Sequence, residues 1–192
     1  MQVLVERRMN THRTTSAKYR ATAAITLATA LATLLIGCAG EEEKREYAVP
    51  SNLCGITVNS EDLAPFLPAG KDISVRDKSY AGAKGCQVVV DKKLILTTAQ
   101  TWLEEGRTTA YFAARQSFDT PEQSADEGRF RYSGNQAFGK TQKCVDAKYK
   151  QELYTAIQAE GSEHKDAQAM KRLIVVYTEE VEDSAECKAG AE

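Results

Sequence analysis

The sequence has 192 residues, with 25 basic side chains, 27 acidic side chains and a formal net charge of −2. Five of the basic residues and only one acidic residue lie in the first 37 positions. The other 155 residues therefore carry 20 basic and 26 acidic side chains, a net charge of −6. Nucleic acids and anionic membrane surfaces are bound through clustered positive charge, so this balance argues against a nucleic-acid partner. The length suits one domain with a modest core.

Residues 1–37 have the layout of a secretory signal peptide. Residues 1–20 are basic, and the segment from Ala21 to Gly37 carries no charged side chain. A basic start, an apolar stretch and small residues before a cleavage point are typical of export signals. The alternative is a retained transmembrane helix, but the segment is slightly short for a span and four threonines dilute its hydrophobicity. We expect an exported protein, with either Met1 or Met9 as the initiator.

The end of this segment, Leu35-Ile36-Gly37-Cys38, resembles the lipobox of bacterial lipoproteins. That motif has an aliphatic residue three positions before a cysteine and a small residue directly before it. The resemblance implies cleavage between Gly37 and Cys38 and a diacylglyceryl group on the Cys38 thiol. Two acyl chains, at about 0.8 kcal/mol per buried CH₂, would anchor the protein firmly on the extracytoplasmic side of the cell membrane. The alternative is an ordinary secreted protein in which Cys38 occurs by chance.

The four other cysteines, Cys54, Cys86, Cys144 and Cys187, form an even set in a chain expected to be exported. This favours two disulfide bonds, for which three pairings are possible from the sequence alone. We favour Cys54 with Cys86 and Cys144 with Cys187, because each pair brackets one half of the domain. No two cysteines have C-x-x-C spacing, which argues against a zinc site or a redox pair.

Residues 38–50 are charged and have no apolar pattern, which predicts a solvated, extended tether before a single domain over 51–192. Asn59 can cap a short helix over 60–66. The β-branched segment 86–91 and the segment 94–102 predict a β-hairpin. Thr108 can cap a helix to about Gln116, with three side chains expected to face the sheet at helical spacing, namely Tyr111, Ala114 and Phe118.

The second half of the chain predicts further strands and one long helix. The polar stretch 119–128 predicts a surface loop. Residues 130–132 and 136–138 flank a turn, and alternation over 153–159 predicts a half-buried strand. Ser162 can cap a helix to about Asp183, with an apolar stripe for the core formed by Ala167, Met170, Ile174, Tyr177 and Val181.

Two strand–strand–helix units thus emerge, near 86–116 and 130–183. They predict an α+β fold in which an antiparallel sheet has helices packed on one face and disulfides staple the domain.

Part of the sequence resembles the first part of small cell-envelope lipoproteins of actinobacteria. The resemblance rests on the stretch from Tyr47 to Gly55, on the short acidic helix after it, and on Gly85-Cys86 at the start of a strand. The resemblance covers roughly 47–102. It implies a lipid-anchored domain with a Cys54–Cys86 bridge, and it implies no activity.

The residues that could carry catalysis are few. His164 is the only histidine after residue 37, and its charged neighbours predict a solvated turn. Glu104 and Glu105 would serve hydrolysis only if burial raised the pKa of one carboxyl group, and their place beside Gly106 predicts a solvated turn as well. The sequence has no phosphate-loop, dinucleotide-binding or nucleophile-elbow motif. We therefore expect no catalytic residue, no metal and no cofactor.

Two charge clusters are candidates for binding. Four acidic residues (Glu179, Glu180, Glu182 and Asp183) lie in the last turns of the long helix, where the helix dipole disfavours negative charge. A solvated face is the default, and calcium or a basic surface is the alternative. The second cluster is a basic aromatic patch that could meet an anionic cell-wall polymer or a lipid headgroup. Its members are Lys140, Lys143, Lys148, Tyr149, Lys150 and Tyr154.

These observations favour a membrane-anchored, non-enzymatic binding or interaction module with a protein or cell-wall partner. A carrier of a small apolar or lipid ligand is the second hypothesis, and it requires a cavity larger than core packing leaves. A cell-envelope hydrolase is the third, and it requires a base beside a nucleophile.

Overall fold

The computed structural model describes residues 44–80, 82–117 and 119–190. The predicted signal peptide, the cleavage point between Gly37 and Cys38, and the lipid-bearing Cys38 lie outside the described residues, as does Phe118. The described elements, in chain order, are β1 (Asn52–Leu53), β2 (Ile56–Thr57), α1 (Ser60–Leu63), η1 (Ala64–Phe66), β3 (Ile73–Asp77), β4 (Ala83–Val90), β5 (Lys93–Glu104), α2 (Thr109–Gln116), β6 (Gln123–Ala125), η2 (Asp126–Gly128), β7 (Phe130–Tyr132), β8 (Gln136–Asp146), β9 (Gln151–Gln158), α3 (Ala167–Glu182) and α4 (Ala185–Gly190).

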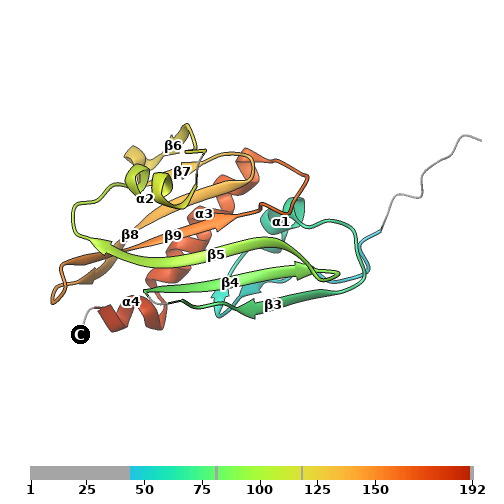
Figure 1. The fold of residues 1–192 in the computed structure, drawn as a ribbon, viewed down its shortest axis with the longest axis horizontal. Helices are drawn as coiled ribbons and strands as arrows, with labels where there is room; N and C mark the ends of the chain where they lie inside the picture. The colour runs from blue at the N-terminus through green and yellow to red at the C-terminus, as the bar shows by residue number, and fades with distance from the viewer. Residues whose placement is uncertain (1–43, 81, 118, 191–192) are drawn as a thin grey trace, which may run out of the picture. The chain divides into compact units, whose positions relative to one another are not determined.

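The centre of the fold is a seven-stranded antiparallel sheet with the strand order β3-β4-β5-β9-β8-β7-β6 (Figure 1). The meander β3–β4–β5 and the meander β7–β8–β9 meet where β5 pairs with β9. The short strands β1 and β2 form a separate hairpin. The predicted α+β class, the antiparallel sheet and the hairpin over 86–102 are confirmed.

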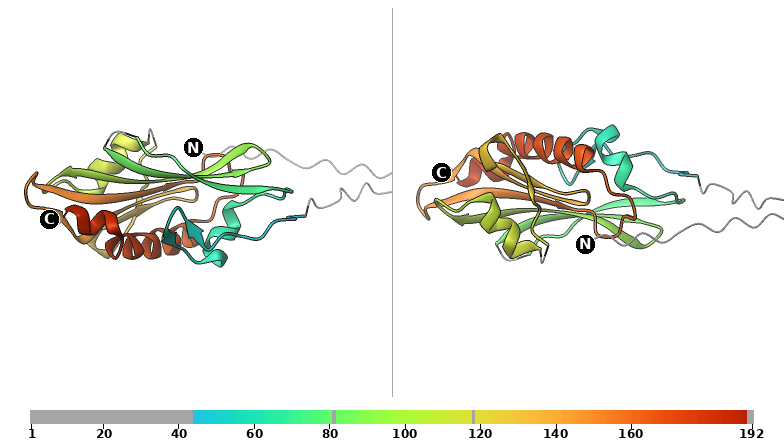
Figure 2. Two further views of the ribbon diagram at one scale, coloured as in Figure 1. Left: turned by 90° about the horizontal axis from the view of Figure 1, so that it is seen from below. Right: turned by 90° about the horizontal axis from the view of Figure 1, so that it is seen from above.

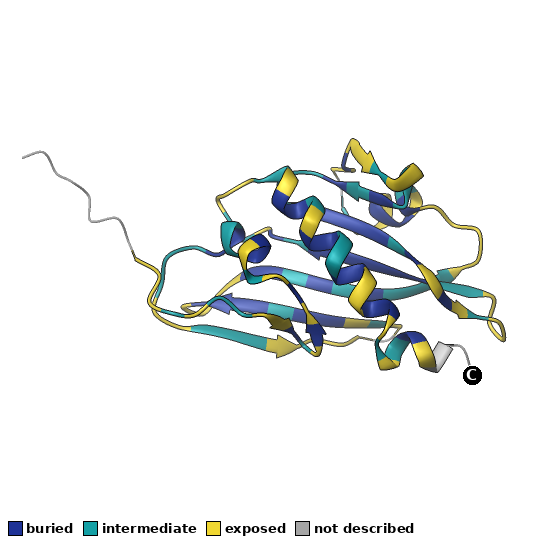
Figure 3. Cartoon of the chain, turned by 180° about the vertical axis from the view of Figure 1, so that it is seen from behind, coloured by how far each residue is buried: buried dark blue, intermediate teal, exposed yellow. Residues whose placement is uncertain are grey.

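The long helix α3 packs on one face of the sheet, together with α1 (Figure 2). Its predicted stripe is confirmed for Met170, Ile174, Tyr177 and Val181, which are buried in the main core. Figure 3 shows the buried side of α3 turned toward the sheet and its exposed side toward solvent. The N-cap differs from the prediction, because Asp166 and not Ser162 accepts the first free N–H groups, those of residues 168 and 169.

The prediction that the helices cover one face needs correction, because α2 lies on the opposite face from α3 (Figure 2). Its Phe112 packs on Phe138 at 5.7 Å and on Tyr154 at 5.4 Å between ring centroids. The predicted inward residues Tyr111 and Ala114 are exposed instead. The central strand β9 is consequently buried on both faces, where alternation had predicted burial on one.

Both favoured disulfides are confirmed. Cys54–Cys86 joins the β1–β2 hairpin to β4, and Cys144–Cys187 joins β8 to α4. The Cα atoms lie 5.8 and 4.8 Å apart, within the range that a disulfide spans. The two bonds therefore fasten the small elements at the ends of the fold to the central sheet.

Two segments predicted to be irregular are ordered against the domain. The described part of the tether is held by Arg45, which donates to the carbonyls of Ala64 and Leu67, and by Tyr47, which donates to the carbonyl of Pro68. Carbonyls at the end of a helix lack intrahelical partners, so they are ready acceptors for a cation. The predicted loop 119–128 contains β6, which pairs with β7 and forms one edge of the sheet.

Candidate functional site

The structure divides the predicted basic aromatic patch into three places. Tyr154 is fully buried under α2, and its hydroxyl donates to the carbonyl of Arg107 at 2.5 Å. Burial raises the pKa of Tyr154 above its ordinary value. Lys140 forms an ion pair with Glu152 at 2.7 Å beside the same ring. Both residues are thus parts of the packing of β8 and β9.

Lys143 lies apart from the rest of the patch, on the side of β8 that faces the end of α3. Its ammonium group is 3.9 Å from a carboxylate oxygen of Glu182. Most of its side chain is exposed. The residue therefore contributes to the surface beside α3.

Lys148, Tyr149 and Lys150 remain together in the turn between β8 and β9. Tyr149 is 64 % exposed, and the ammonium group of Lys148 lies 5.0 Å from the centroid of its ring. Asp146 fixes the turn by accepting from the backbone N–H of Tyr149 at 2.9 Å. Neither lysine forms an ion pair with a residue of the described ranges.

The connection between β5 and α2 lies directly beside this turn. The N–H of Glu105 donates to the carbonyl of Lys150 at 2.8 Å, and the N–H of Gly106 donates to Glu152 at 2.9 Å. The connection brings a second exposed tyrosine to this surface. The guanidinium of Arg107 stacks 4.7 Å from the ring centroid of Tyr111, which is 38 % exposed.

We call the surface formed by Arg107, Tyr111, Lys148, Tyr149 and Lys150 the hairpin end. Sequence reasoning found the three residues of the β8–β9 turn and missed the other two. Arg107 precedes the N-cap Thr108 and lies outside α2, so its stacking on Tyr111 is not a helical contact that the spacing predicts. No sequence pattern shows that the β5–α2 connection and the β8–β9 turn meet.

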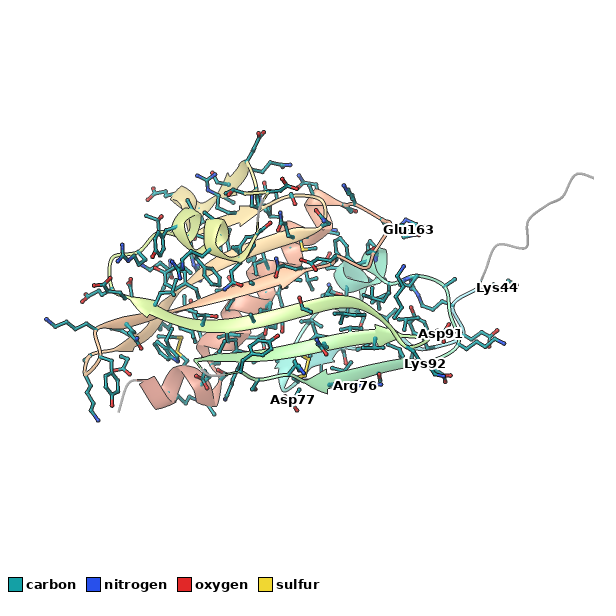
Figure 4. All side chains as sticks on the ribbon, in the orientation of Figure 1. Lys44, Arg76, Asp77, Asp91, Lys92 and Glu163 are labelled. Atoms are coloured by element: carbon teal, nitrogen blue, oxygen red, sulfur yellow. A yellow bond between two sulfur atoms is a disulfide. The ribbon has the colours of Figure 1, made fainter. Side chains whose placement is uncertain are left out.

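The hairpin end is far from the point where the chain joins the domain. Glu46 bonds Gly70 beside the β4–β5 turn, and β5 runs from that turn at Lys93 to Glu104 at the hairpin end. Twelve residues of strand span about 40 Å. Figure 4 shows Lys44, Asp91 and Lys92 together at the joining end. The first described residue, Lys44, therefore lies at the end of β5 opposite Tyr111 and Tyr149 (Figure 4).

The acidic cluster at the end of α3 has a partner within the domain. Glu182 is buried and forms an ion pair with Arg129 at 2.8 Å, and it accepts from the N–H of Gln142 at 2.7 Å. Glu179, Glu180 and Asp183 are exposed. No group of three or more His, Cys, Asp or Glu side chains in the described ranges is arranged to hold a metal ion. The cluster thus divides into one structural carboxylate and a solvated face.

The candidate catalytic residues lie at opposite ends of the sheet. His164 lines an open hollow of about 360 Å³ with Val90 and Ile95, near the β4–β5 turn. Glu104 is exposed at the hairpin end and pairs with Arg107. The two candidates therefore do not form one catalytic group.

Comparisons of this chain with protein-family models, with curated proteins and with solved structures find no match. Within residues 44–190, apart from the two undescribed positions, no helix has both the length and the apolar character needed to cross a membrane.

Proposed function

We propose that the protein is a lipid-anchored, extracytoplasmic interaction module that binds an anionic cell-envelope partner through its hairpin end, without catalysing a reaction. The observation that carries this proposal is the exposed ring of Tyr149 between Lys148 and Lys150, beside the Arg107–Tyr111 stack. Tyrosine and arginine are enriched at interfaces, because they offer large contact areas with hydrogen-bonding groups. Lysines without an internal ion pair can attract an anionic partner.

The position of the hairpin end supports this proposal. The hairpin end lies at the end of β5 opposite the start of the described domain, where Glu46 bonds Gly70. The turn is also rigid at its base, where Asp146 and Glu105 bond its backbone. A preorganised surface loses less conformational entropy on binding than a flexible loop does.

Core packing favours surface binding over the carrier hypothesis. The space between α3 and the sheet is filled by buried side chains, including Met170, Leu173, Ile174 and Tyr177. The hollow beside His164 is open to solvent and has charged residues, among them Lys93 and Glu163, in its lining. A carrier of an apolar molecule needs a largely apolar, enclosing site.

The partner is tested by charge reversal at both ends of the domain. Purified full-length protein is sedimented with washed cell-wall fragments, and the bound fraction is measured for Lys148→Glu/Lys150→Glu and for the matched control Lys92→Glu/Lys93→Glu in the exposed β4–β5 turn. We expect the first variant to bind about tenfold more weakly and the control to bind like wild type. Added salt should weaken the wild-type interaction. Unchanged binding by the first variant, or an equal loss in the control, would overturn the proposal.

The anchor is tested separately with Cys38→Ser. The lipobox resemblance implies that this variant is released from the membrane fraction or keeps residues 1–37, whereas mature wild type begins at a Cys38 that carries two acyl chains. Cell fractionation and intact mass measure both properties. A cleaved Cys38→Ser protein that stays in the membrane as wild type does would contradict the anchor.

A further inference from the structure

The sheet ends at β3, an edge strand whose outer backbone groups face away from β4. The N–H of Asp91 donates to the carbonyl of Asp72, and the N–H of Lys78 donates to the carbonyl of Gly85. Bonded positions alternate along an antiparallel pair, so Ser74 and Arg76 bond β4. The N–H and C=O groups of Ile73, Val75 and Asp77 therefore point outward. An edge of this kind is a template for another strand.

The charges along this edge are arranged symmetrically about Ser74. The segment Lys71-Asp72-Ile73-Ser74-Val75-Arg76-Asp77 has a basic and an acidic residue at each end and apolar residues on both sides of the serine. All four charged side chains are exposed, and none forms an ion pair with another residue of the described ranges. Figure 4 shows Arg76 and Asp77 at the free edge.

We infer that β3 pairs antiparallel with β3 of a second copy of this chain, with Ser74 opposite Ser74 on a two-fold axis. This register places Ile73 opposite Val75, and Asp72, directly before the strand, opposite Arg76. Lys71 is left out of the pairing, because it precedes the strand and its N–H donates to the carboxylate of Asp91. The outward groups of Ile73 and Val75 then form the hydrogen bonds between the copies. The interface is isologous, as in most closed dimers, and joins the two sheets into one.

Other registers fit less well. Pairing centred on Val75 places Ile73 opposite the carboxylate of Asp77, and pairing centred on Arg76 places two guanidinium groups opposite each other. Like charges directly opposite in a sheet are destabilising. Edge strands that only prevent association carry charges that would repel a second strand or be left without a partner when it paired. At the edge of β3 the charges of Asp72 and Arg76 match under two-fold rotation, so they favour a second copy.

The sheet face at this strand leaves space for the paired side chains. Ser74 and Arg76, together with Val89 of β4, line an open hollow of about 480 Å³ on the face opposite α3. The helix on that face, α2, contacts β7 and β8 at the other end of the strand order. The Asp72–Arg76 pairs of a dimer would form on this open surface.

A cysteine at Ser74 tests the inference in the full-length protein in its own membrane. In the proposed register the two Ser74 residues form a non-hydrogen-bonded pair, with Cα atoms about 4.5 Å apart, a separation that a disulfide can span. Ser74→Cys should therefore give a covalent dimer on mild oxidation. The matched control is Ser124→Cys on β6, which is exposed on the opposite edge of the sheet. It should give no more dimer than wild type, which also reports any background from Cys38.

Charge exchange tests the register. In the Ser74→Cys protein, Arg76→Glu places two carboxylates opposite each other in each symmetric pair and should lower the rate of dimer formation about tenfold. Adding Asp72→Arg restores opposite charges and should restore the rate. Equal cross-linking by Ser74→Cys and Ser124→Cys would overturn the inference, and so would dimer formation by Val75→Cys in place of Ser74→Cys. The hairpin end has no part in this pairing, so the two proposals fail independently.

Discussion

At the scale of single residues, the ion pair Glu182–Arg129 explains how one acidic residue at the end of α3 is buried. The helix dipole disfavours Glu182 at this position, but the guanidinium of Arg129 at 2.8 Å and the N–H of Gln142 at 2.7 Å both donate to its Oε1 atom. The ammonium group of Lys143 lies 3.9 Å from its Oε2 atom. The sequence shows the unfavourable charge, for which a solvated face was the default prediction and calcium or a basic surface the alternative. It cannot show that the partner is Arg129, because 53 positions separate the two residues.

Glu186 gives the domain a pH-dependent contact. It accepts from the indole N–H of Trp102 at 2.9 Å and pairs with Lys84 at 2.7 Å. Burial alone would raise the pKa of Glu186, but the hydrogen bonds from Lys84 and Trp102 outweigh burial and lower it below the ordinary value. Because the folded pKa is lowered, this contact stabilises the fold above the ordinary glutamate pKa and is lost as pH falls through the folded value.

The prediction is measurable because Trp102 is the only tryptophan of the chain. Its fluorescence should change with a midpoint below pH 4.5 during acid titration, as protonated Glu186 releases the indole and α4 loosens. Glu186→Gln should remove this transition and leave the later, global acid unfolding. An identical transition in wild type and in Glu186→Gln would show that another group is responsible.

At the scale of elements, caps and periodic stripes were the most predictable features. Asn59 and Thr108 cap α1 and α2 as predicted, because each side chain accepts a backbone N–H within three residues. Ser162 fails because backbone bonds from Gly161 to Ile95 and from Asp166 to Gly134 hold residues 161–166 against the sheet. The helix can begin only after these long-range contacts end.

Strands were harder to predict from local pattern. The edge strand β3 mixes charged and apolar residues, because only one of its faces contacts the core. The strand β8 extends to Asp146, well past the predicted segment 136–138, and its second half is polar where it forms the surface of a hairpin. β3 is specified by its pairing with β4, and β8 by its pairing with β9. The sequence of one segment alone does not encode such pairing.

The orientation of α2 shows the same limit. Its short sequence offers two helical faces, one with Tyr111 and Ala114 and one with Phe112 and Ala113. The second face is buried because Phe138 and Tyr154 project from β8 and β9 on the side where the chain leaves β5. Tyr111 is left on the surface, where it becomes part of the hairpin end.

At the scale of the whole molecule, the disulfides and the layers follow from properties that the sequence displays. Four cysteines divided between two halves of the chain favoured the observed pairing, and the two hydrophobic clusters lie on the two faces of one antiparallel sheet. The hairpin end and the free edge of β3 arise only when distant segments meet. Three of the five residues of the hairpin end, and not the free edge of β3, were therefore predicted from the sequence.

The central claim, that the hairpin end is the surface that meets a partner, is tested most directly by photo-cross-linking in living cells. A photoreactive phenylalanine analogue replaces Tyr149 in one variant and Leu94, which is 41 % exposed near the opposite end of the sheet, in the other. We predict a covalent adduct of the chain with an envelope component from position 149 and none from position 94. No adduct from position 149, or equal adducts from both positions, would contradict the claim.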